Sequence, residues 1–399
     1  MTQTGSSAPL ACVMGDMDLV RPLGLAGVRC AVVARRGAPK RFSRFVRAAV
    51  DWADAWEEPE ALVEALARFG SAQREKPVLY YEGDHELLLV SRYRLRLADT
   101  FRFVIPEPTL VEDLVDKARF RRLAERLNLP VPRSQAVGPV DSGSVAQLEL
   151  SFPFIVKPLT RRSDHWEPIG GSQKALQVDG PGAWRELRPR LAEAQLPVLL
   201  QELIPGPETR IESYHVYVDD RGAIVGEFTG RKIRTYPAQY GHSTALETTD
   251  ATDTRALGRA LVGRLGLRGV AKFDFKRRPD GTLCLLEVNP RFNLWHHLGA
   301  VAGVNLPALV YDDLVGRPRG ATPRARAGAR WCKPLDDLAA VRSAGLPLRS
   351  WLTFAVRSDA RRALALDDPL PVLYGGALAL AERSASIVRS RVARLATAS

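Results

Sequence analysis

The first part of the chain alternates short apolar runs with amphipathic stretches. Residues 10–14 and 30–34 are apolar runs of strand length, and the stretch between them has a helical pattern that ends near a glycine. A strand, a helix and a second strand in this order predict a βαβ unit and a parallel sheet. A helix over 58–70 and a strand over 77–81 continue the pattern. We therefore expect a small doubly wound α/β domain over residues 1–110.

Beyond this point strand-like runs become more frequent. The pattern of residues 111–127 predicts one strongly amphipathic helix, which Asn128 and Pro130 would end. Turn residues at 219–222 join two of the later runs, which predicts an antiparallel sheet. The predicted strands cover 152–158, 175–178, 198–204, 212–218 and 223–229, and the predicted helices cover 184–194, 254–265 and 297–314.

One predicted hairpin carries a group of oxygen-bearing side chains. Its strands are 271–275 and 282–288, joined by a Pro-Asp-Gly turn. Glu287 and Asn289 are two positions apart and share a face, and hairpin pairing can bring Asp274 near them. Oxygen ligands without histidine or cysteine suit Mg²⁺. A solvated strand edge is the alternative interpretation.

Two features upstream of the hairpin are suited to phosphate. Lys157 is the one lysine in an apolar strand-like run, where it can face a cleft or extend its ammonium to solvent. The polar stretch 160–174 contains Gly170, Gly171 and Ser172. Glycines allow backbone N–H groups to approach an anion closely. This stretch is either a loop that covers phosphates or a plain flexible loop.

Several further side chains are candidates for substrate contacts. Arg231, Lys232 and Arg234 lie within four residues and can form either an anion clamp or a solvated edge. Arg291 follows the hairpin and is placed near whatever anions it binds. Glu82 and Asp84 follow the strand over 77–81 and can face a substrate. Tyr240 and His242, in the polar segment 236–244, can do the same. The roles of these four residues are left open.

The last part of the chain has no evident chemistry. Residues 316–330 are rich in arginine, glycine, proline and alanine and predict an exposed loop. Helical patterns follow around 335–343, 358–364 and 376–396. We expect a C-terminal helical segment over 321–399 with a structural or oligomeric role, and a homodimer is left open.

Composition narrows the class of protein. A length of 399 residues suits two or three domains, and hydrophobic and charged fractions of 46% and 26% are ordinary for a globular protein. The sequence contains no membrane span and no secretory signal, and its four cysteines are scattered, so we expect a cytoplasmic protein with reduced thiols. The net charge of +12 is spread along the chain, which disfavours nucleic acid as the partner.

From about residue 10 to 315 the chain resembles the ATP-grasp superfamily of carboxylate–amine ligases. The C-terminal segment is similar to that of D-aspartate-ligase-like enzymes and other bacterial ATP-grasp proteins. The resemblance implies a Rossmann-like domain over 1–110 and an ATP-grasp domain of two α+β subdomains over 111–320. It also implies that ATP binds between two antiparallel sheets.

The resemblance assigns roles residue by residue. The metal ligands would be Asp274, Glu287 and Asn289, and Arg291 would lie beside the transferred phosphoryl group. The implied ATP-binding residues are Lys117, Lys157, Gly170, Gly171, Ser172, Gln201, Glu202, Leu203, Ile204 and Glu208. Arg231, Lys232 and Arg234 are left as candidates for the substrate carboxylate or the γ-phosphate.

The implied reaction is ATP-dependent amide bond formation. A small-molecule carboxylate would become an acylphosphate with release of ADP, and an amine would then displace phosphate. The cofactors would be ATP and two Mg²⁺ ions, with Mn²⁺ as an alternative metal. The default substrate is an amino acid or a small peptide. An ATP-grasp kinase, a carboxylase and a non-catalytic nucleotide-binding protein are the alternatives.

Overall fold

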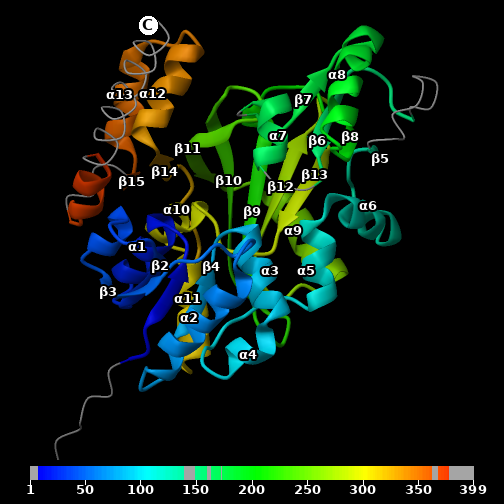
Figure 1. Ribbon diagram of the computed structural model, residues 1–399. Coiled ribbons are helices and arrows are strands. Elements are labelled where there is room, and N and C mark those ends of the chain that lie inside the picture. Colours follow the sequence, from blue (N-terminus) through cyan, green and yellow to red (C-terminus); the bar gives the residue numbers. More distant parts are fainter. Residues whose placement is uncertain (1–7, 139–148, 160–162, 172, 362–366, 377–399) are drawn as a thin grey trace, which may run out of the picture.

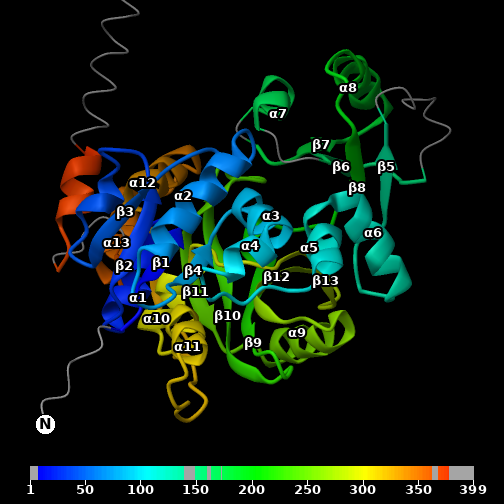
Figure 2. The same cartoon turned by 60° about the horizontal axis from the view of Figure 1, so that its bottom comes forward.

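A computed structural model describes residues 8–138, 149–159, 163–171, 173–361 and 367–376. These residues form three sheets, which Figures 1 and 2 show side by side. The blue N-terminal unit and the smaller green sheet lie on either side of the long strands of the third sheet. The predicted combination of α/β and α+β units is confirmed.

The N-terminal unit is a parallel four-stranded sheet in the order β3-β2-β1-β4. The direction of chain order reverses at β1. Sheets with such a reversal bind ligands in a crevice beyond the carboxyl ends of the two strands, here β1 and β4, and we call this place the N-terminal crevice. The unit contains β1 (Ala11–Met14), α1 (Met17–Leu25), β2 (Cys30–Ala34), η1 (Pro39–Phe42), β3 (Val46–Asp51), α2 (Pro59–Ser71), β4 (Val78–Tyr81), α3 (Asp84–Arg92) and α4 (Arg94–Ala98).

The single helix predicted over 111–127 is wrong. The structure has two helices, α5 (Pro108–Val115) and α6 (Lys117–Arg126), separated at Asp116. Asp116 has an extended backbone, and its carboxylate accepts a hydrogen bond from the backbone N–H of Arg119 at 2.8 Å. This aspartate caps α6, and the cap interrupts a continuous amphipathic pattern.

The small sheet is antiparallel, in the order β5-β8-β6-β7. The polar stretch predicted as a loop contains a helix, α7, because Trp166 is buried against the sheet and its indole N–H donates to the carbonyl of Gln173 at 2.6 Å. The elements are β5 (Ser134–Val137), β6 (Phe154–Pro158), α7 (Ser163–Gly170), β7 (Leu176–Val178), α8 (Pro181–Glu193) and β8 (Val198–Glu202).

The large sheet has the order β13-β12-β9-β10-β11-β14-β15. Helix α9 covers one face, and α10 and α11 pack between the other face and the N-terminal sheet, so that one core contains Val13, Tyr80, Phe228 and Trp295. The elements are η3 (Glu208–Arg210), β9 (Ile211–Val218), β10 (Ile224–Tyr236), β11 (His242–Thr249), α9 (Thr252–Leu265), β12 (Gly269–Arg277), β13 (Leu283–Asn289), α10 (Trp295–Val301) and α11 (Leu306–Leu314).

The C-terminal segment extends this sheet. It contains β14 (Arg330–Cys332), α12 (Pro334–Ser343), α13 (Leu348–Arg357) and β15 (Ala360–Arg361). The helix predicted at 358–364 is wrong, because Ala360 pairs with Trp331 in a parallel ladder. The helix predicted at 376–396 lies almost entirely outside the described residues.

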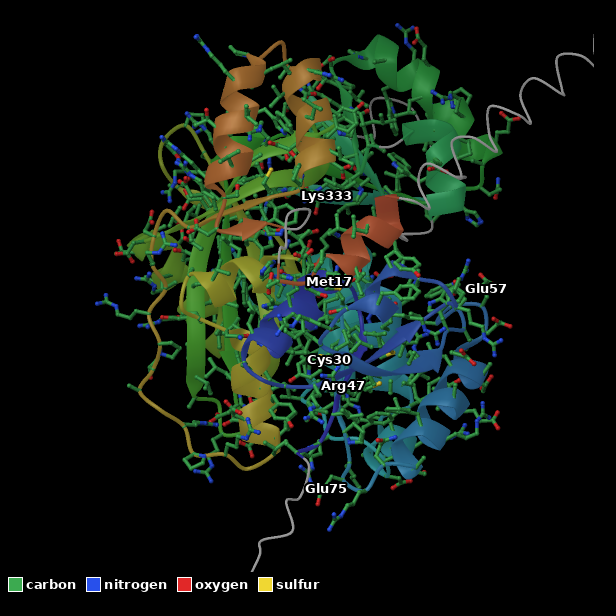
Figure 3. The ribbon with its side chains drawn as sticks, turned by 90° about the vertical axis from the view of Figure 1, so that its left-hand side faces the viewer. Met17, Cys30, Arg47, Glu57, Glu75 and Lys333 are labelled. Carbon is green, nitrogen blue, oxygen red and sulfur yellow. The ribbon has the colours of Figure 1, made fainter. Side chains whose placement is uncertain are left out.

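The segment also contacts the N-terminal unit. Asp368 is buried and accepts hydrogen bonds from the Ser43 hydroxyl at 2.5 Å and the Arg44 backbone at 2.9 Å. Figure 3 shows the short red helix that follows Asp368 above the blue unit containing Met17. The C-terminal segment therefore connects the parallel sheet to the large sheet.

The cysteines and the lengths of the helices were also subjects of prediction. All four cysteines are buried and none forms a disulfide. Burial raises the pKa of the Cys30 thiol to about 12, so this thiol is protonated at neutral pH. Within the described part of the chain, no helix is both long and apolar enough to cross a membrane.

Asp337 is the buried contact that fixes α12 to the sheet. It accepts two hydrogen bonds from Arg234, each at 2.7 Å, and one from the Thr244 hydroxyl at 2.8 Å. Its side chain is fully buried. Removal of this carboxylate leaves the Arg234 guanidinium without its partner in a largely buried position, and a broken buried pair is strongly destabilising.

We expect Asp337→Ala to lower the free energy of unfolding by about 3–5 kcal/mol. The neighbouring Asp336 is the matched control, because it pairs with Lys333 at the surface and Asp336→Ala should cost less than about 1 kcal/mol. Urea unfolding followed by tryptophan fluorescence measures both. Equal effects of the two substitutions would contradict this account of the segment.

Candidate active site

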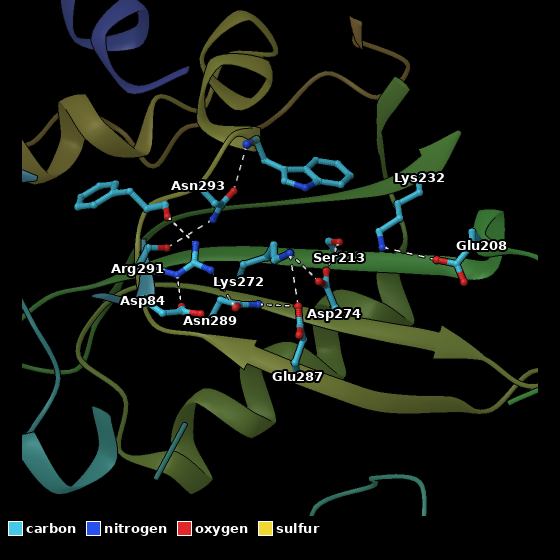
Figure 4. A network of polar contacts seen from close by, with 12 residues as sticks. Asp84, Glu208, Ser213, Lys232, Lys272, Asp274, Glu287, Asn289, Arg291 and Asn293 are labelled. Carbon is cyan, nitrogen blue, oxygen red and sulfur yellow. Dashed lines mark hydrogen bonds and ion pairs between the residues drawn. The ribbon is translucent and has the colours of Figure 1, made fainter. Parts of the chain in front are cut away.

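The β12–β13 hairpin brings the three predicted metal ligands together. Asp274 is opposite Glu287 in the antiparallel ladder, and Lys272 is opposite Asn289. Alternation along β12 gives Lys272 and Asp274 a common face, and a register shift after Asp274 adds one residue to β13. Figure 4 shows the resulting cluster on one side of the sheet. The ligand roles themselves stay predictions.

Direct contacts join these side chains. The Ser213 hydroxyl donates to Asp274 Oδ1 at 2.5 Å, and Lys272 Nζ lies 2.5 Å from Asp274 Oδ2 and 4.0 Å from Glu287 Oε1. Asn289 Nδ2 donates to the same Glu287 oxygen at 2.9 Å. The sequence analysis missed Ser213 and Lys272. Lys272 could have been found from its spacing of two from Asp274, whereas Ser213 comes from a neighbouring strand.

The donor set fits a hard cation. It offers two carboxylates and one amide oxygen, which is the chemistry that Mg²⁺ takes before completing its shell with water and phosphate oxygens. The ammonium of Lys272 already lies between the two carboxylates, so the structure places positive charge there. Among the described residues, no group of three or more His, Cys, Asp or Glu side chains could hold a metal. A metal at this site would therefore need the amide of Asn289 as well.

Arg291 ties the hairpin to the N-terminal unit. Its Nε lies 2.5 Å from Asp84 Oδ1, and its Nη1 donates to the Glu82 carbonyl at 2.7 Å. Its Nη2 lies 3.4 Å from Asn289 Oδ1. The Arg291 and Asp84 side chains are only 14% and 13% exposed, so the ion pair is shielded from solvent. The guanidinium thus connects the carboxyl end of β4 to the β12–β13 hairpin, which Figure 4 shows beside Asp84.

The crevice itself has charges of both signs. Glu82 accepts a hydrogen bond from the Asp16 backbone N–H at 2.6 Å, and Lys40 Nζ donates to the Gly15 carbonyl at 2.6 Å. A side chain at Gly15 would place its Cβ 2.7 Å from the Glu82 carboxylate, so a larger residue would require the Glu82 side chain to move. Carboxylates and a guanidinium therefore meet where the parallel sheet opens.

Several of the predicted nucleotide residues lie on or beside the small sheet. Lys157 Nζ donates to the Gln201 side chain at 2.8 Å, and Lys117 Nζ donates to the Pro158 carbonyl at 2.5 Å. Glu202 receives Arg278 at 2.8 Å, and this hydrogen bond holds the pKa of the Glu202 carboxyl below its ordinary value. Leu203 and Ile204, which the resemblance also assigns to ATP binding, directly follow β8, and Ile204 is buried.

The predicted phosphate loop differs from expectation. Gly170 is the last residue of α7, and its hydrogen faces the indole of Trp166. Gly171 follows in the left-handed region at φ +58°, which suits glycine. Ser172 lies outside the described residues. A helix therefore precedes the glycines, where the sequence pattern indicated a loop throughout.

The polar segment at 236–244 packs beside this region. The Tyr240 carbonyl accepts the Lys174 backbone N–H at 3.1 Å, and the Tyr240 hydroxyl lies 3.3 Å from the Gln177 side chain. Burial, with smaller contributions from neighbouring ammonium groups such as that of Lys174, lowers the pKa of His242 to about 4. His242 is therefore neutral at physiological pH.

The three clustered cations do not act together in the structure. Lys232 lies 3.9 Å from Glu208, but the adjacent Arg231 points to the other face and pairs with Glu247 at 3.1 Å. A register irregularity between Lys232 and Arg234 redirects Arg234 to Asp337. Lys276, which the sequence analysis did not single out, approaches Glu208 from β12 at 3.9 Å.

Comparison with known proteins agrees with this architecture. Residues 195–333 match the family described as "ATP-grasp in the biosynthetic pathway with Ter operon". D-aspartate ligase of Enterococcus faecium is 24% identical over 290 residues, which are 70% of this chain and 68% of that protein. D-alanine–D-alanine ligase of Stutzerimonas stutzeri is 29% identical over 209 residues, which are 50% of this chain and 63% of that protein.

A solved structure has the same fold. N5-carboxyaminoimidazole synthetase from Staphylococcus aureus superposes with a TM-score of 0.62 at 13% identity, over 85% of each chain. The family match covers the large sheet and the hairpin, and the structural match extends the likeness to most of the chain. Residues 195–333 thus match an ATP-grasp family, and the two relatives named above are ligases.

Proposed function

We propose that this protein is an ADP-forming ligase that joins a small carboxylate to an amine. The observation that carries the proposal is the position of Arg291. Its guanidinium contacts Asn289 of the metal hairpin and Asp84 of the N-terminal crevice, so it lies between the predicted phosphate site and the predicted substrate site. A cation there can hold a carboxylate close to the group that it attacks.

ATP and Mg²⁺ are the cofactors in this proposal. Asp274, Glu287 and Asn289 would hold the metal, which neutralises charge on the β- and γ-phosphate oxygens when bound. Lys157 and Lys117 would contact phosphates, and the segment after β8 would contact the base. Phosphoryl transfer depends mainly on positioning and charge neutralisation, and these side chains supply both.

The reaction would proceed in two steps. A carboxylate oxygen held beside Arg291 attacks the γ-phosphorus, which forms an acylphosphate and releases ADP. The amine then attacks the acyl carbon, phosphate leaves with the electron pair of the broken C–O bond, and the amine loses a proton. Closure of the segment around Gly170 and Gly171 would exclude water, which would otherwise hydrolyse the intermediate.

An amino acid is the favoured substrate class. The crevice beyond β1 and β4 places a guanidinium and carboxylates within one site, and an amino acid has a matching carboxylate and ammonium. The name of the D-aspartate ligase that this chain resembles supports the same class. A kinase reaction on a hydroxyl group is the alternative, and it would release ADP without phosphate.

A screen of amino-acid pairs tests the proposal. With ATP and Mg²⁺, a productive pair should release ADP and phosphate in equal amounts and give a product of the summed mass less one water. Coupled assays for ADP and phosphate, followed by mass spectrometry, measure this. ADP release without phosphate would identify a kinase and refute the ligase assignment.

We expect Glu287→Gln to reduce the rate of ADP formation by at least about 100-fold. Loss of a residue that only hydrogen-bonds to a metal ligand typically lowers activity by about 10- to 100-fold, and loss of the ligand itself should lower it more. Asp280→Asn, in the exposed turn of the same hairpin, is the matched control and should retain activity. Steady-state rates at saturating Mg²⁺ measure both. An undiminished rate in Glu287→Gln would exclude the metal role.

We expect Asp84→Asn to lower kcat/KM for the carboxylate substrate roughly 10- to 100-fold, because Arg291 loses its orienting partner. The affinity for ADP should not change, since Asp84 lies on the N-terminal side of the site. Glu86→Gln, on the same turn of α3, is the control. A loss confined to ADP binding would show that Asp84 does not act through Arg291.

A further inference from the structure

The charged group formed by Glu208, Lys232 and Lys276 has an unusual spacing. Glu208 Oε2 lies 3.9 Å from Lys232 Nζ, and Glu208 Oε1 lies 3.9 Å from Lys276 Nζ. Direct hydrogen bonds between such groups are about 2.7–2.9 Å long. Within the described residues neither Lys232 nor Lys276 forms a hydrogen bond through its ammonium. Each oxygen of the Glu208 carboxylate therefore faces an ammonium that is too far away for a direct hydrogen bond.

Lys276 is poorly suited to a purely structural role. Its side chain is only 8% exposed, so its ammonium is largely shielded from water. An ammonium that has little access to water and no direct hydrogen bond is costly. A polar group between the ammonium and the carboxylate would satisfy both.

The position of Lys276 in the sheet indicates which group this is. Lys276 follows Asp274 by two residues on β12, so it shares the face of the metal hairpin about 7 Å further along the strand. Figure 4 shows Glu208 and Lys232 on that side of Asp274 and Ser213. If phosphates lie over Asp274 and the base lies beside Gln201, the ribose lies between them.

We propose that Lys276 is a nucleotide-binding residue that donates a hydrogen bond to a ribose hydroxyl whose hydrogen is accepted by Glu208. This inference rests on the proposed ATP-binding function. A hydroxyl group is the one part of a nucleotide that can accept from an ammonium and donate to a carboxylate at once. Lys276 then selects ribonucleotides over deoxyribonucleotides.

Binding of three nucleotides to the full chain tests this role. Isothermal titration calorimetry with Mg²⁺ would compare ADP, 2′-deoxy-ADP and 3′-deoxy-ADP. The protein should bind at least one deoxynucleotide roughly ten- to hundredfold more weakly than ADP, because a hydrogen bond to charged groups is lost. In Lys276→Met that penalty should fall below about threefold, while ADP itself binds roughly tenfold more weakly.

Two further variants separate recognition from folding. Lys276→Arg keeps a donor at this position and should restore part of the discrimination. Lys76→Met changes an exposed lysine of the N-terminal unit that donates to the Ala98 carbonyl, and it should leave all three affinities unchanged. Melting temperatures of the nucleotide-free variants show whether each is folded.

The outcomes distinguish this inference from the proposed function. If the wild-type protein binds ADP but Lys276→Met weakens all three nucleotides equally, the ribose contact is refuted and a phosphate contact replaces it. Equal wild-type affinities for all three nucleotides also refute the inference alone. Failure of the wild-type protein to bind ADP would refute the proposed ATP-dependent function as well.

Discussion

The pairing register of β12 is the constraint on which the site depends. β12 is hydrogen-bonded to β9 on one side and to β13 on the other, so its register is fixed twice. A shift of one residue would move Lys272, Asp274 and Lys276 to the opposite face, where α9 packs on the apolar core. The burial of Phe273 and Phe275 therefore holds the polar residues that alternate with them in the site.

The second requirement is that two separate sheets meet at this hairpin. Arg291 and Asp84 are 207 residues apart in sequence, and their ion pair lies at the point where the parallel sheet opens. Behind them, side chains of both sheets share one apolar core, in which the Tyr80 ring packs at a tilt against the Phe292 ring with 4.9 Å between ring centroids. The shared core thus supports the ion pair between Arg291 and Asp84, and the ion pair in turn orients the Arg291 guanidinium.

Local patterns were sufficient for much of the fold. The strand at 30–34 and the hairpin around Asp274 follow from apolar runs and turn residues, and these are determined by neighbours in sequence. The break at Asp116 was missed because a side-chain cap interrupts an otherwise regular helical pattern. β15 was missed because its two residues depend on pairing with distant β14.

The site shows the same division. Residues on one hairpin could be grouped from their spacing, whereas Ser213 and Asp84 reach the group from other strands and helices. Arg231 and Arg234 were grouped with Lys232 by proximity in sequence, but strand alternation and a register irregularity separate them. Sequence patterns predict what one element presents, and the meeting of elements has to be seen in the structure.

We propose that a carboxylate is activated by phosphorylation over this hairpin. The most direct measurement uses a productive substrate whose carboxylate oxygens are labelled with ¹⁸O, with mass spectrometry of the phosphate released. An acylphosphate pathway transfers one labelled oxygen from each carboxylate to phosphate. Phosphate without label, formed together with the amide product, would contradict the account.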